Sequence, residues 1–401
     1  MRPFTSTISL EEARRRLDAA VRPITRTERV RLEEAAGRVA AADVTSPLDV
    51  PPFARSAMDG YAVVAADTSG ATRALPVRLR QLDRIYTGQL SPITITPGTC
   101  AEIATGAPLP AGADAVVMVE ETAKAGDEIQ IFAQAAAGHH IGRRGTDISA
   151  GDRVVSPGEW LSPSRVGALA AIGCVDAEVF AKPRVAILST GNEVVEPGRA
   201  LAPGQIFDVN RFTLGAIVSM HGGEPEPHGP AQDTIDALVQ SFDACAQADL
   251  IVFSGGSSVG ERDLVVDAIA ARGEMIFHGI AIRPGKPTAF ARVKGVPFFG
   301  MPGNPTSCLS NAYILLVPFL RAIARLPPYA PRTVRAPLGR RIVSAAGRHQ
   351  FYTVRLEDGI ASPAFKGSGD ITSLSRADGY IEIASDQSVV EEGALVDVTL
   401  F

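Results

Sequence analysis

The feature that most constrains the fold is a repeat of apolar run, short loop and helical pattern. Three apolar runs, at residues 184–188, 250–253 and 296–300, have the length and composition of buried strands. Apolar residues at helical spacing follow each run, for example at residues 214–218. Alternating strands and helices favour a mostly parallel sheet, so we predict an α/β domain over residues 182–326.

Two other segments are typical of β structure. Between residues 49 and 147, short β-type runs are broken by Gly and Pro, and this segment is expected to be a β-rich domain. In the segment 327–401, Asp358-Gly359 lies between two apolar runs and predicts a hairpin in a small C-terminal β domain. A chain of 401 residues exceeds the roughly 250 to 300 residues of a single core, which agrees with several domains.

The N-terminal segment is predicted to be helical. Ser9 and Glu12 form a capping box, and apolar residues then recur at helical spacing until Pro23. An apolar helical pattern also appears between residues 148 and 181, and we expect it to pack against the first helix. Further along, Asn210 is expected to cap the helix that follows the first buried strand.

Composition excludes several classes of function. The net charge of -5 argues against a nucleic-acid binder, which usually has a basic balance or patch. The four cysteines lie far apart without a CxxC pair, so we expect reduced thiols and no zinc site. His139 and His140 are interpreted as solvated loop residues. Because no window offers about 18 consecutive apolar residues and no signal-peptide pattern is present, we expect a cytoplasmic protein without a membrane span.

Small, polar or Gly-rich loops follow the three buried strands, at residues 189–193, 254–263 and 300–305. In open α/β sheets, ligands bind outside the carboxyl ends of the strands, and glycine lets the backbone approach an anion closely. A phosphate-bearing ligand fits such an edge. The alternative is that the glycines serve only the geometry of tight turns.

Charged residues near these loops add to the prediction. Arg283 and Lys286 lie on a loop stiffened by prolines and suit an oxyanion or phosphate, although a solvated turn is the alternative. Glu193 and Asp263 could converge on one Mg²⁺ that faces a ligand phosphate. Asp263 could instead cap the helix that begins near Leu264, and for Asp233 capping is the favoured interpretation.

Two segments of the β-rich domain stay unassigned on spacing alone. They are residues 56–62, which contain Asp59-Gly60, and residues 105–108, which begin at Thr105. Each could be an ordinary turn.

At these motifs the sequence resembles the molybdopterin molybdenumtransferase family, which includes MoeA in bacteria and the gephyrin E domain. The matching stretches occur in family order and cover most of the chain. They are Pro52-Phe53, residues 56–62, 105–110, 143–148, 189–193 and 208–211, the Gly255-Gly256 loop to Asp263, and residues 283–287 and 302–305.

The resemblance implies an elongated four-domain chain that works as a homodimer. Residues 1–48 together with 148–181 would form one domain, interrupted by the β-rich domain at 49–147. The α/β domain at 182–326 would bind molybdopterin, and residues 327–401 would form a small β-barrel-like domain. The active site would combine the α/β domain of one subunit with the β-rich domain of the other.

The implied substrates are adenylylated molybdopterin and molybdate, and the implied products are the molybdenum cofactor and AMP. Asp59, Glu193 and Asp263 are the expected catalytic residues, and Glu193 with Asp263 would hold Mg²⁺. Molybdate is a tetrahedral dianion that cationic side chains and loop donors can hold by charge-assisted hydrogen bonds. The expected substrate-binding residues are Thr105, Ser254, Gly255, Gly256, Ser257, Arg283, Lys286, Pro302, Gly303 and Asn304.

Three positions depart from the family pattern, namely Asn192, Ser257 and Arg262, and the last two leave open a paralogue with altered or lost activity. Two other functions compete with the insertion enzyme. A non-catalytic scaffold on the same fold predicts loss of the acidic residues, which are present here. The related adenylyltransferase predicts a shorter chain without the Asp59 segment. A molybdopterin adenylyltransferase and molybdoenzyme chaperones are candidate partners.

Overall fold

The computed structural model describes residues 7–255, 264–344 and 347–401. The chain forms two compact units. Unit 1 comprises Met1–Glu28, Gly37–Val39 and Val179–Phe401, and unit 2 comprises Arg29–Ala36 and Ala40–Glu178. This division is coarser than the four predicted domains, whose boundaries stay a prediction.

The centre of unit 1 is a six-stranded sheet in the order β16-β13-β17-β21-β20-β18. Strands β16, β13, β17 and β21 run parallel, whereas β20 and β18 are antiparallel to their neighbours. The predicted mostly parallel sheet is therefore confirmed. The strands are β13 (Arg184–Ser189), β16 (Glu224–Pro227), β17 (Leu250–Ser254), β18 (Gly273–His278), β20 (Ala289–Val293) and β21 (Val296–Met301).

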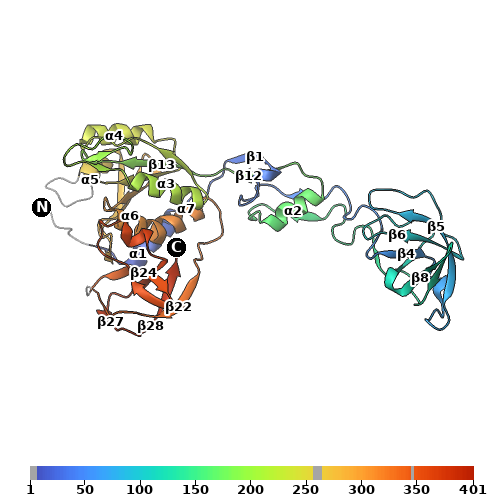
Figure 1. Cartoon of the computed structure of the whole chain (residues 1–401). Helices are drawn as coiled ribbons and strands as arrows, with labels where there is room; N and C mark the ends of the chain where they lie inside the picture. The colour runs from blue at the N-terminus through green and yellow to red at the C-terminus, as the bar shows by residue number, and fades with distance from the viewer. Residues whose placement is uncertain (1–6, 256–263, 345–346) are drawn as a thin grey trace. The chain divides into compact units, whose positions relative to one another are not determined.

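Helices cover both faces of this sheet (Figure 1). On one face, α4 (Ile235–Ala244) and α5 (Leu264–Arg272) pack over buried rings that include Phe242 and Phe298. On the other face lie α3 (Asn210–Met220), α6 (Pro305–Asn311), the π-helical turn η4 (Ala312–Leu316) and α7 (Val317–Ile323). Each fully buried side chain of this size contributes roughly 1.5 to 3 kcal/mol to folding, so the two cores fix the sheet and its loops.

The continuous helical stretch Pro305–Ile323 is long and apolar enough to cross a membrane by length and composition. Within this structure 72% of its most apolar window is buried. It packs in the same core cluster as the sheet, which is how a core helix of a globular protein behaves. The π turn precedes Pro318, whose missing backbone donor is a usual cause of an altered helical turn.

The first helix, α1 (Leu10–Ala20), begins as predicted, because Ser9 Oγ accepts a hydrogen bond from the Glu12 amide at 3.1 Å. Its packing differs from the prediction. The apolar face of α1, with Leu10 and Leu17, belongs to the core of the α/β sheet in unit 1, whereas the helix within residues 148–181 belongs to unit 2. A helical pattern specifies that one face is buried, but it does not specify the surface that buries it.

The C-terminal segment forms a second sheet of unit 1, in the order β19-β24-β26-β28-β22, with β25 beside β24. Its hairpin turns at Asp358 and Gly359, both with positive φ, as the sequence predicts. Strand β19 lies in the α/β segment of the chain but pairs with β24 of this second sheet. The elements are β19 (Ile282–Arg283), β22 (Thr333–Pro337), β23 (Ile342–Val343), β24 (His349–Glu357), β25 (Ile360–Pro363), α8 (Thr372–Ser375), β26 (Gly379–Ile383), β27 (Val389–Val390) and β28 (Leu395–Leu400).

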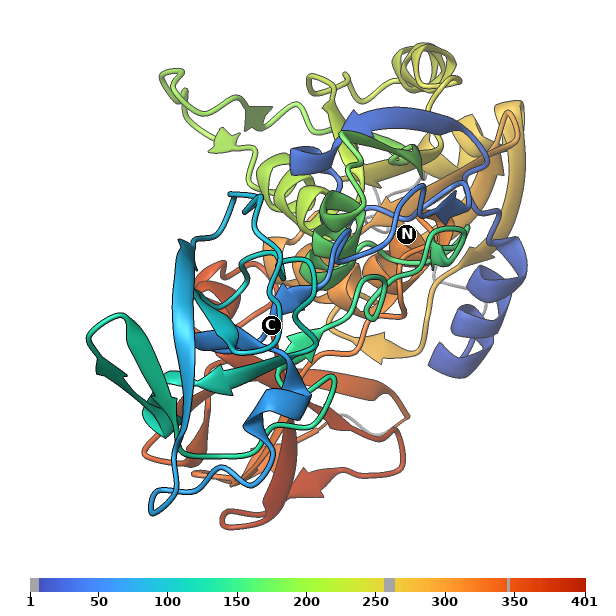
Figure 2. The ribbon, with the colours of Figure 1, turned by 90° about the vertical axis from the view of Figure 1, so that its right-hand side faces the viewer.

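Unit 2 contains the β-rich segment, in which six strands form one sheet in the order β7-β4-β6-β5-β9-β8. Figure 2 shows the long strand β5 in light blue beside the teal hairpin of β8 and β9. These strands are β4 (Gly60–Val63), β5 (Val77–Ile85), β6 (Thr99–Ile103), β7 (Ala115–Met118), β8 (Thr122–Ala125) and β9 (Glu128–Ile131). Shorter elements include β2 (Val44–Thr45), β3 (Arg55–Ser56), β10 (Ile141–Gly142), β11 (Arg153–Val155) and α2 (Pro163–Ala171).

Candidate functional site

The carboxyl ends of three parallel strands lie level with one another in unit 1. Ser189 at the end of β13 is the register partner of Ser254 at the end of β17, and Ser254 is the partner of Met301 in β21. The loops that follow therefore leave the sheet at one edge, as the pattern of parallel strands predicts. The Thr190 amide donates to the Ser254 carbonyl at 3.1 Å and joins two of these loops directly.

Glycine is required where these loops meet. Gly255 has φ +126°, and a Cβ there would lie 2.4 Å from the Thr190 carbonyl oxygen. A Cβ on Gly303 would lie 3.6 Å from the Gly255 Cα, which is an ordinary contact distance. The loops after β13, β17 and β21 thus approach one another backbone to backbone, and a ligand at this edge would meet main-chain groups from all three.

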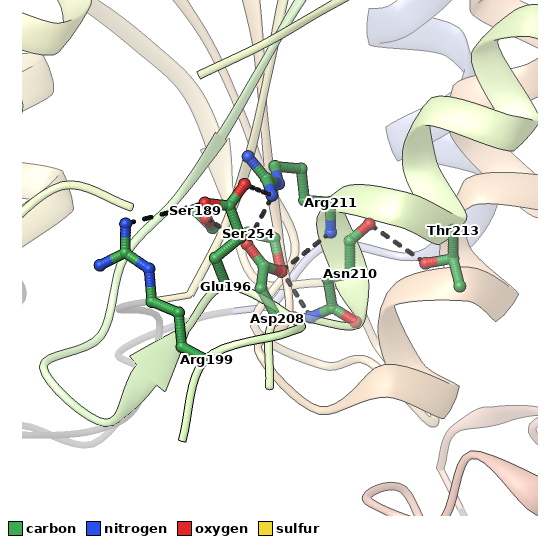
Figure 3. A network of polar contacts seen from close by, with 8 residues as sticks. All are labelled: Ser189, Glu196, Arg199, Asp208, Asn210, Arg211, Thr213 and Ser254. Atoms are coloured by element: carbon green, nitrogen blue, oxygen red, sulfur yellow. Dashed lines mark hydrogen bonds and ion pairs between the residues drawn. The ribbon is translucent and has the colours of Figure 1, made fainter. Parts of the chain in front are cut away.

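A polar network beneath the loops connects them (Figure 3). Ser189 Oγ donates to Asp208 Oδ2 at 2.6 Å. Asn210 Nδ2 donates to Ser254 Oγ at 2.7 Å and to the Gly303 carbonyl at 2.8 Å. Both Asp208 and Asn210 are buried, so these hydrogen bonds are shielded from competing water.

Arg211 completes the network on the outer side. Its guanidinium donates to Glu196 at 2.7 Å and lies 3.8 Å from the Asp208 carboxylate, while its own amide donates to Asp208 Oδ1 at 3.0 Å. The hydrogen bond from Arg211 lowers the pKa of Glu196. The buried carboxylate of Asp208 is therefore compensated by two partners, as a buried charge requires.

The predicted helix caps at two positions are wrong. Asn210 does not cap α3 because it is the first residue of the helix, and Asp208 accepts from the Arg211 amide in its place. The side-chain NH2 group of Asn210 donates to the loops. Thr234 caps α4 by accepting from the Ala237 amide. This leaves Asp233 to accept a hydrogen bond from the Thr190 hydroxyl at the end of β13, so Asp233 belongs to the site.

Glu193 lies at the exposed rim of the first loop. A Cβ on Gly191, which has φ +141°, would lie 3.0 Å from Glu193 Oε1, so this carboxylate folds back over the glycine. The other predicted metal ligand, Asp263, lies outside the described residues, as do Gly256 and Ser257. Within the described part of the chain, no group of three or more His, Cys, Asp or Glu side chains could hold a metal ion. The predicted pair of Glu193 and Asp263 thus stays a prediction.

The Arg283 loop is held from below by a buried amide. Asn311 Nδ2 on α6 donates to the Gly285 carbonyl at 3.1 Å, and Gly285 has φ +100° with no room for a Cβ beside Asn311. Arg283 is exposed at the end of β19, and Lys286 is partly buried. The loop is therefore held in place and carries two cations, and its anion-binding role stays a prediction.

The loop of residues 302–304 contacts the C-terminal segment. Asn304 Nδ2 donates to Ser368 Oγ at 3.1 Å, and the amide of Thr306 donates to the Ser368 carbonyl at 3.1 Å. Ser368 was missed by sequence reasoning because it lies in a Gly-Ser-Gly stretch that is typical of any turn. Its placement connects the C-terminal sheet to the N-terminus of α6.

Asp59 and Thr105 lie together in unit 2. Asp59 Oδ1 accepts from the Thr105 amide at 2.8 Å, and the Gly106 amide donates to the Ser56 carbonyl at 2.8 Å. The next residue, Gly60, has no room for a side chain, since a Cβ would lie 1.9 Å from the Val117 carbonyl oxygen. The two unassigned segments thus form one exposed corner, separate in the chain from the loops of unit 1.

Known protein families match most of the length of this chain. Family models match residues 8–173 (MoeA N-terminal region, domains I and II), 186–322 (described as a probable molybdopterin binding domain) and 335–401 (MoeA C-terminal region, domain IV). Molybdopterin molybdenumtransferase 2 of Mycobacterium tuberculosis is 38% identical over 390 residues, covering 94% of this chain and 95% of the relative. This chain belongs to the MoeA family of molybdopterin molybdenumtransferases.

Other relatives agree with membership of the MoeA family. A molybdopterin molybdenumtransferase of Haemophilus influenzae is 32% identical over 404 residues, covering 98% of each chain. A crystal structure of a MoeA protein from Pyrococcus horikoshii OT3 superposes with a TM-score of 0.83 at 31% identity, covering 99% of this chain and 100% of that chain. The predicted family and the multidomain fold of α/β and β-rich segments are confirmed. The competing adenylyltransferase is ruled out, because the MoeA N-terminal and C-terminal regions are both present.

Proposed function

We propose that this MoeA-family chain inserts molybdate into the dithiolene of adenylylated molybdopterin and releases AMP and the molybdenum cofactor. The observation that carries the proposal is the set of three glycine-containing loops joined at the carboxyl edge of the parallel sheet by Asp208 and Asn210. Main-chain donors that converge at such an edge suit the phosphates of a nucleotide-linked pterin.

Cationic and hydroxyl groups near this edge would bind the molybdate dianion. Arg283, on its fixed loop, would attract the dianion, and Lys286 would share that task. Ser254 and Asn304 would orient oxygen atoms of the ligand through hydrogen bonds, each worth roughly 1.5 to 3 kcal/mol when charge-assisted. The Pro302 loop and Gly303 would line the pterin because they lie beside Gly255.

Mg²⁺ is the proposed cofactor, and the exposed carboxylate of Glu193 has the donor chemistry that a partly hydrated magnesium ion prefers. Glu193 and Asp263 would hold it. When bound, the ion offsets charge that develops on the phosphate as the adenylyl link is hydrolysed. The partly buried Asp233, which accepts from Thr190, would keep the adjacent loop in place during that step.

The proposed active form is a homodimer in the cytoplasm. Asp59 and Thr105 would come from the partner subunit and would face the loops of unit 1, where Asp59 would orient water or the pterin. A molybdopterin adenylyltransferase would deliver the substrate, and molybdoenzyme chaperones would receive the product.

The decisive experiment supplies purified protein with adenylylated molybdopterin, Mg²⁺ and molybdate, and measures AMP together with active cofactor. Molybdate-dependent release of both supports the insertion enzyme. Tight binding without turnover would favour a paralogue that carries or scaffolds the cofactor, and turnover that survives removal of Mg²⁺ would contradict the metal assignment. Repeating the assay with tungstate would measure the oxyanion preference.

A further inference from the structure

The segment Asp208–Arg211 connects all three strand-end loops, although it ends none of the three strands itself. Asp208 bonds to Ser189 at the end of β13, and Asn210 bonds to Ser254 at the end of β17 and to Gly303 after β21. These contacts reach across 19, 44 and 93 residues of the chain. A segment of four residues thus sets the geometry of a whole sheet edge.

Asn210 occupies the central position in this arrangement. Its side-chain amide offers two N–H donors, and both are used, one for the Ser254 hydroxyl and one for the Gly303 carbonyl. The residue is only 7% exposed. A carboxylate in the same place could accept from the hydroxyl but would face the Gly303 carbonyl without a proton to share, so the link to the third loop specifically needs an amide.

A helix-capping role does not account for this residue. Asp208 supplies the hydrogen bond to the first turn of α3, and no side-chain cap is made by the residue before Asn210. Packing alone does not explain it either, because an apolar residue of similar size would fill the volume without leaving a buried polar amide to satisfy. The common property of its two partners is that each belongs to a loop of the proposed ligand site.

We infer that Asn210 is a positioning residue that fixes the spacing between the Gly255 and Gly303 loops, and through it the affinity for the phosphate-bearing pterin. The inference rests on the proposed function. Gly303 lies beside Gly255, since a Cβ on it would be in ordinary contact at 3.6 Å from the Gly255 Cα, so a loss of alignment alters the surface that both loops present. Asn210 itself touches no ligand in this scheme.

The test measures equilibrium binding of adenylylated molybdopterin to the full chain by pterin fluorescence, with the number of sites per chain determined separately from Kd. We expect Asn210→Asp and Asn210→Ala to raise Kd by at least about tenfold while about one site per chain remains, because loss of alignment weakens each binding contact. A purely structural role would instead reduce the number of competent sites and leave Kd of the remaining sites unchanged.

Two control variants separate the side-chain link from the rest of α3. Thr213→Val removes a hydrogen bond to the backbone carbonyl of Asn210 but leaves the amide in place, and Ser219→Ala removes a hydroxyl contact on the same helix. Both should bind with the Kd of the unmodified chain. If Asn210→Ala does not fold, the isosteric Asn210→Asp decides the matter.

Two outcomes overturn the inference in different ways. An unchanged Kd in Asn210→Asp, with full site occupancy, would show that the amide does not set the spacing of the loops. Failure of the unmodified chain to bind adenylylated molybdopterin would overturn the proposed function itself, and so the two failures are distinguishable.

Discussion

At the scale of single residues, two neighbouring glycines of the site carry different constraints. Gly255 combines φ +126° with a would-be Cβ only 2.4 Å from the Thr190 carbonyl oxygen, whereas Gly303 has an ordinary backbone and a would-be contact of 3.6 Å. Backbone strain of the first kind costs about 1 to 3 kcal/mol even before the clash is counted. The same substitution at the two positions should therefore have unequal effects on folding.

We predict that Gly255→Ala lowers the unfolding midpoint of unit 1 and abolishes AMP release. Gly303→Ala should leave the unfolding midpoint nearly unchanged, because the methyl group fits, but should weaken molybdopterin binding by filling the space between the loops. Thermal unfolding followed by circular dichroism, together with the binding assay, checks both. Equal destabilisation by the two variants would contradict the backbone argument.

A second residue-scale prediction concerns pH. His221 is buried, both of its ring nitrogens lack a hydrogen-bond partner, and Tyr313 and Tyr329 contact its ring. Burial, with a smaller effect of Arg321, lowers its pKa. The unfolded chain then binds more protons, so this contribution to stability is complete above the unfolded pKa of about 6.5 and is lost as the pH falls towards the lower folded pKa.

The expected result is a steeper fall in melting temperature between about pH 7 and pH 5 for the unmodified chain than for His221→Phe, which keeps the aromatic contacts without a titrating group. Melting curves at a series of pH values measure this slope. His139, which is exposed in unit 2, provides a matched control through His139→Gln. A slope that His221→Phe leaves unchanged would show that other groups dominate the acid response.

At the scale of elements, the sequence predicts where α1 begins but not the surface against which it packs. The capping hydrogen bond between Ser9 and the Glu12 amide follows from sequence spacing alone. The placement of Leu10 and Leu17 in the core of unit 1 does not, because the same apolar stripe could pack on any complementary surface. Asn210 and Asp233 behave in the same way. The side chains of Asp208 and Thr234 cap the two helices, and the side chains of Asn210 and Asp233 bond to the strand ends.

We predict that Ser9→Ala destabilises unit 1 by about 1 kcal/mol through loss of the helix cap. Urea unfolding measures the change as a lower midpoint with an unchanged slope. Since Ser9 is exposed and contacts none of the proposed ligand-binding residues, AMP release per folded molecule should stay the same. A loss of specific activity without a loss of stability would assign α1 a role beyond packing.

At the scale of the whole molecule, the proposed site draws on residues of both units. Asp59 and Thr105 belong to unit 2, and Glu193, Ser254 and Arg283 belong to unit 1. If the site is shared between subunits of a dimer, two inactive variants can complement one another. An equal mixture of Asp59→Asn and Glu193→Gln subunits should recover about a quarter of the unmodified activity, because half of the dimers are mixed and each has one intact site.

The complementation experiment requires exchange of subunits after mild unfolding, and the recovered activity is measured as AMP release. Asp127→Ala, in an exposed turn of the same β sheet, is the matched control and should be fully active alone. No recovery in the mixture, with each variant inactive by itself, would place both residues in one subunit. A monomer in sedimentation equilibrium at micromolar concentration would contradict the dimer directly.

Much of this protein follows from its sequence. Residue periodicity identified the three central parallel strands, the helices that follow them, the Asp358-Gly359 turn, and the sheet edge with its three loops, because each depends on neighbours close in the chain. The family followed from the order and spacing of the motifs. The predicted roles of Glu193, Asp59 and Arg283 stay predictions.

Tertiary structure alone decided which distant groups meet. It placed α1 in the core of unit 1, brought Ser368 to Asn304, and gave Asn210 two partners that lie 44 and 93 residues away. Such contacts depend on how whole elements pack, and a local sequence pattern does not predict that packing. Buried hydrogen bonds must be satisfied by whatever group the packing supplies, so the side chains that hold the site together emerge only in the folded chain.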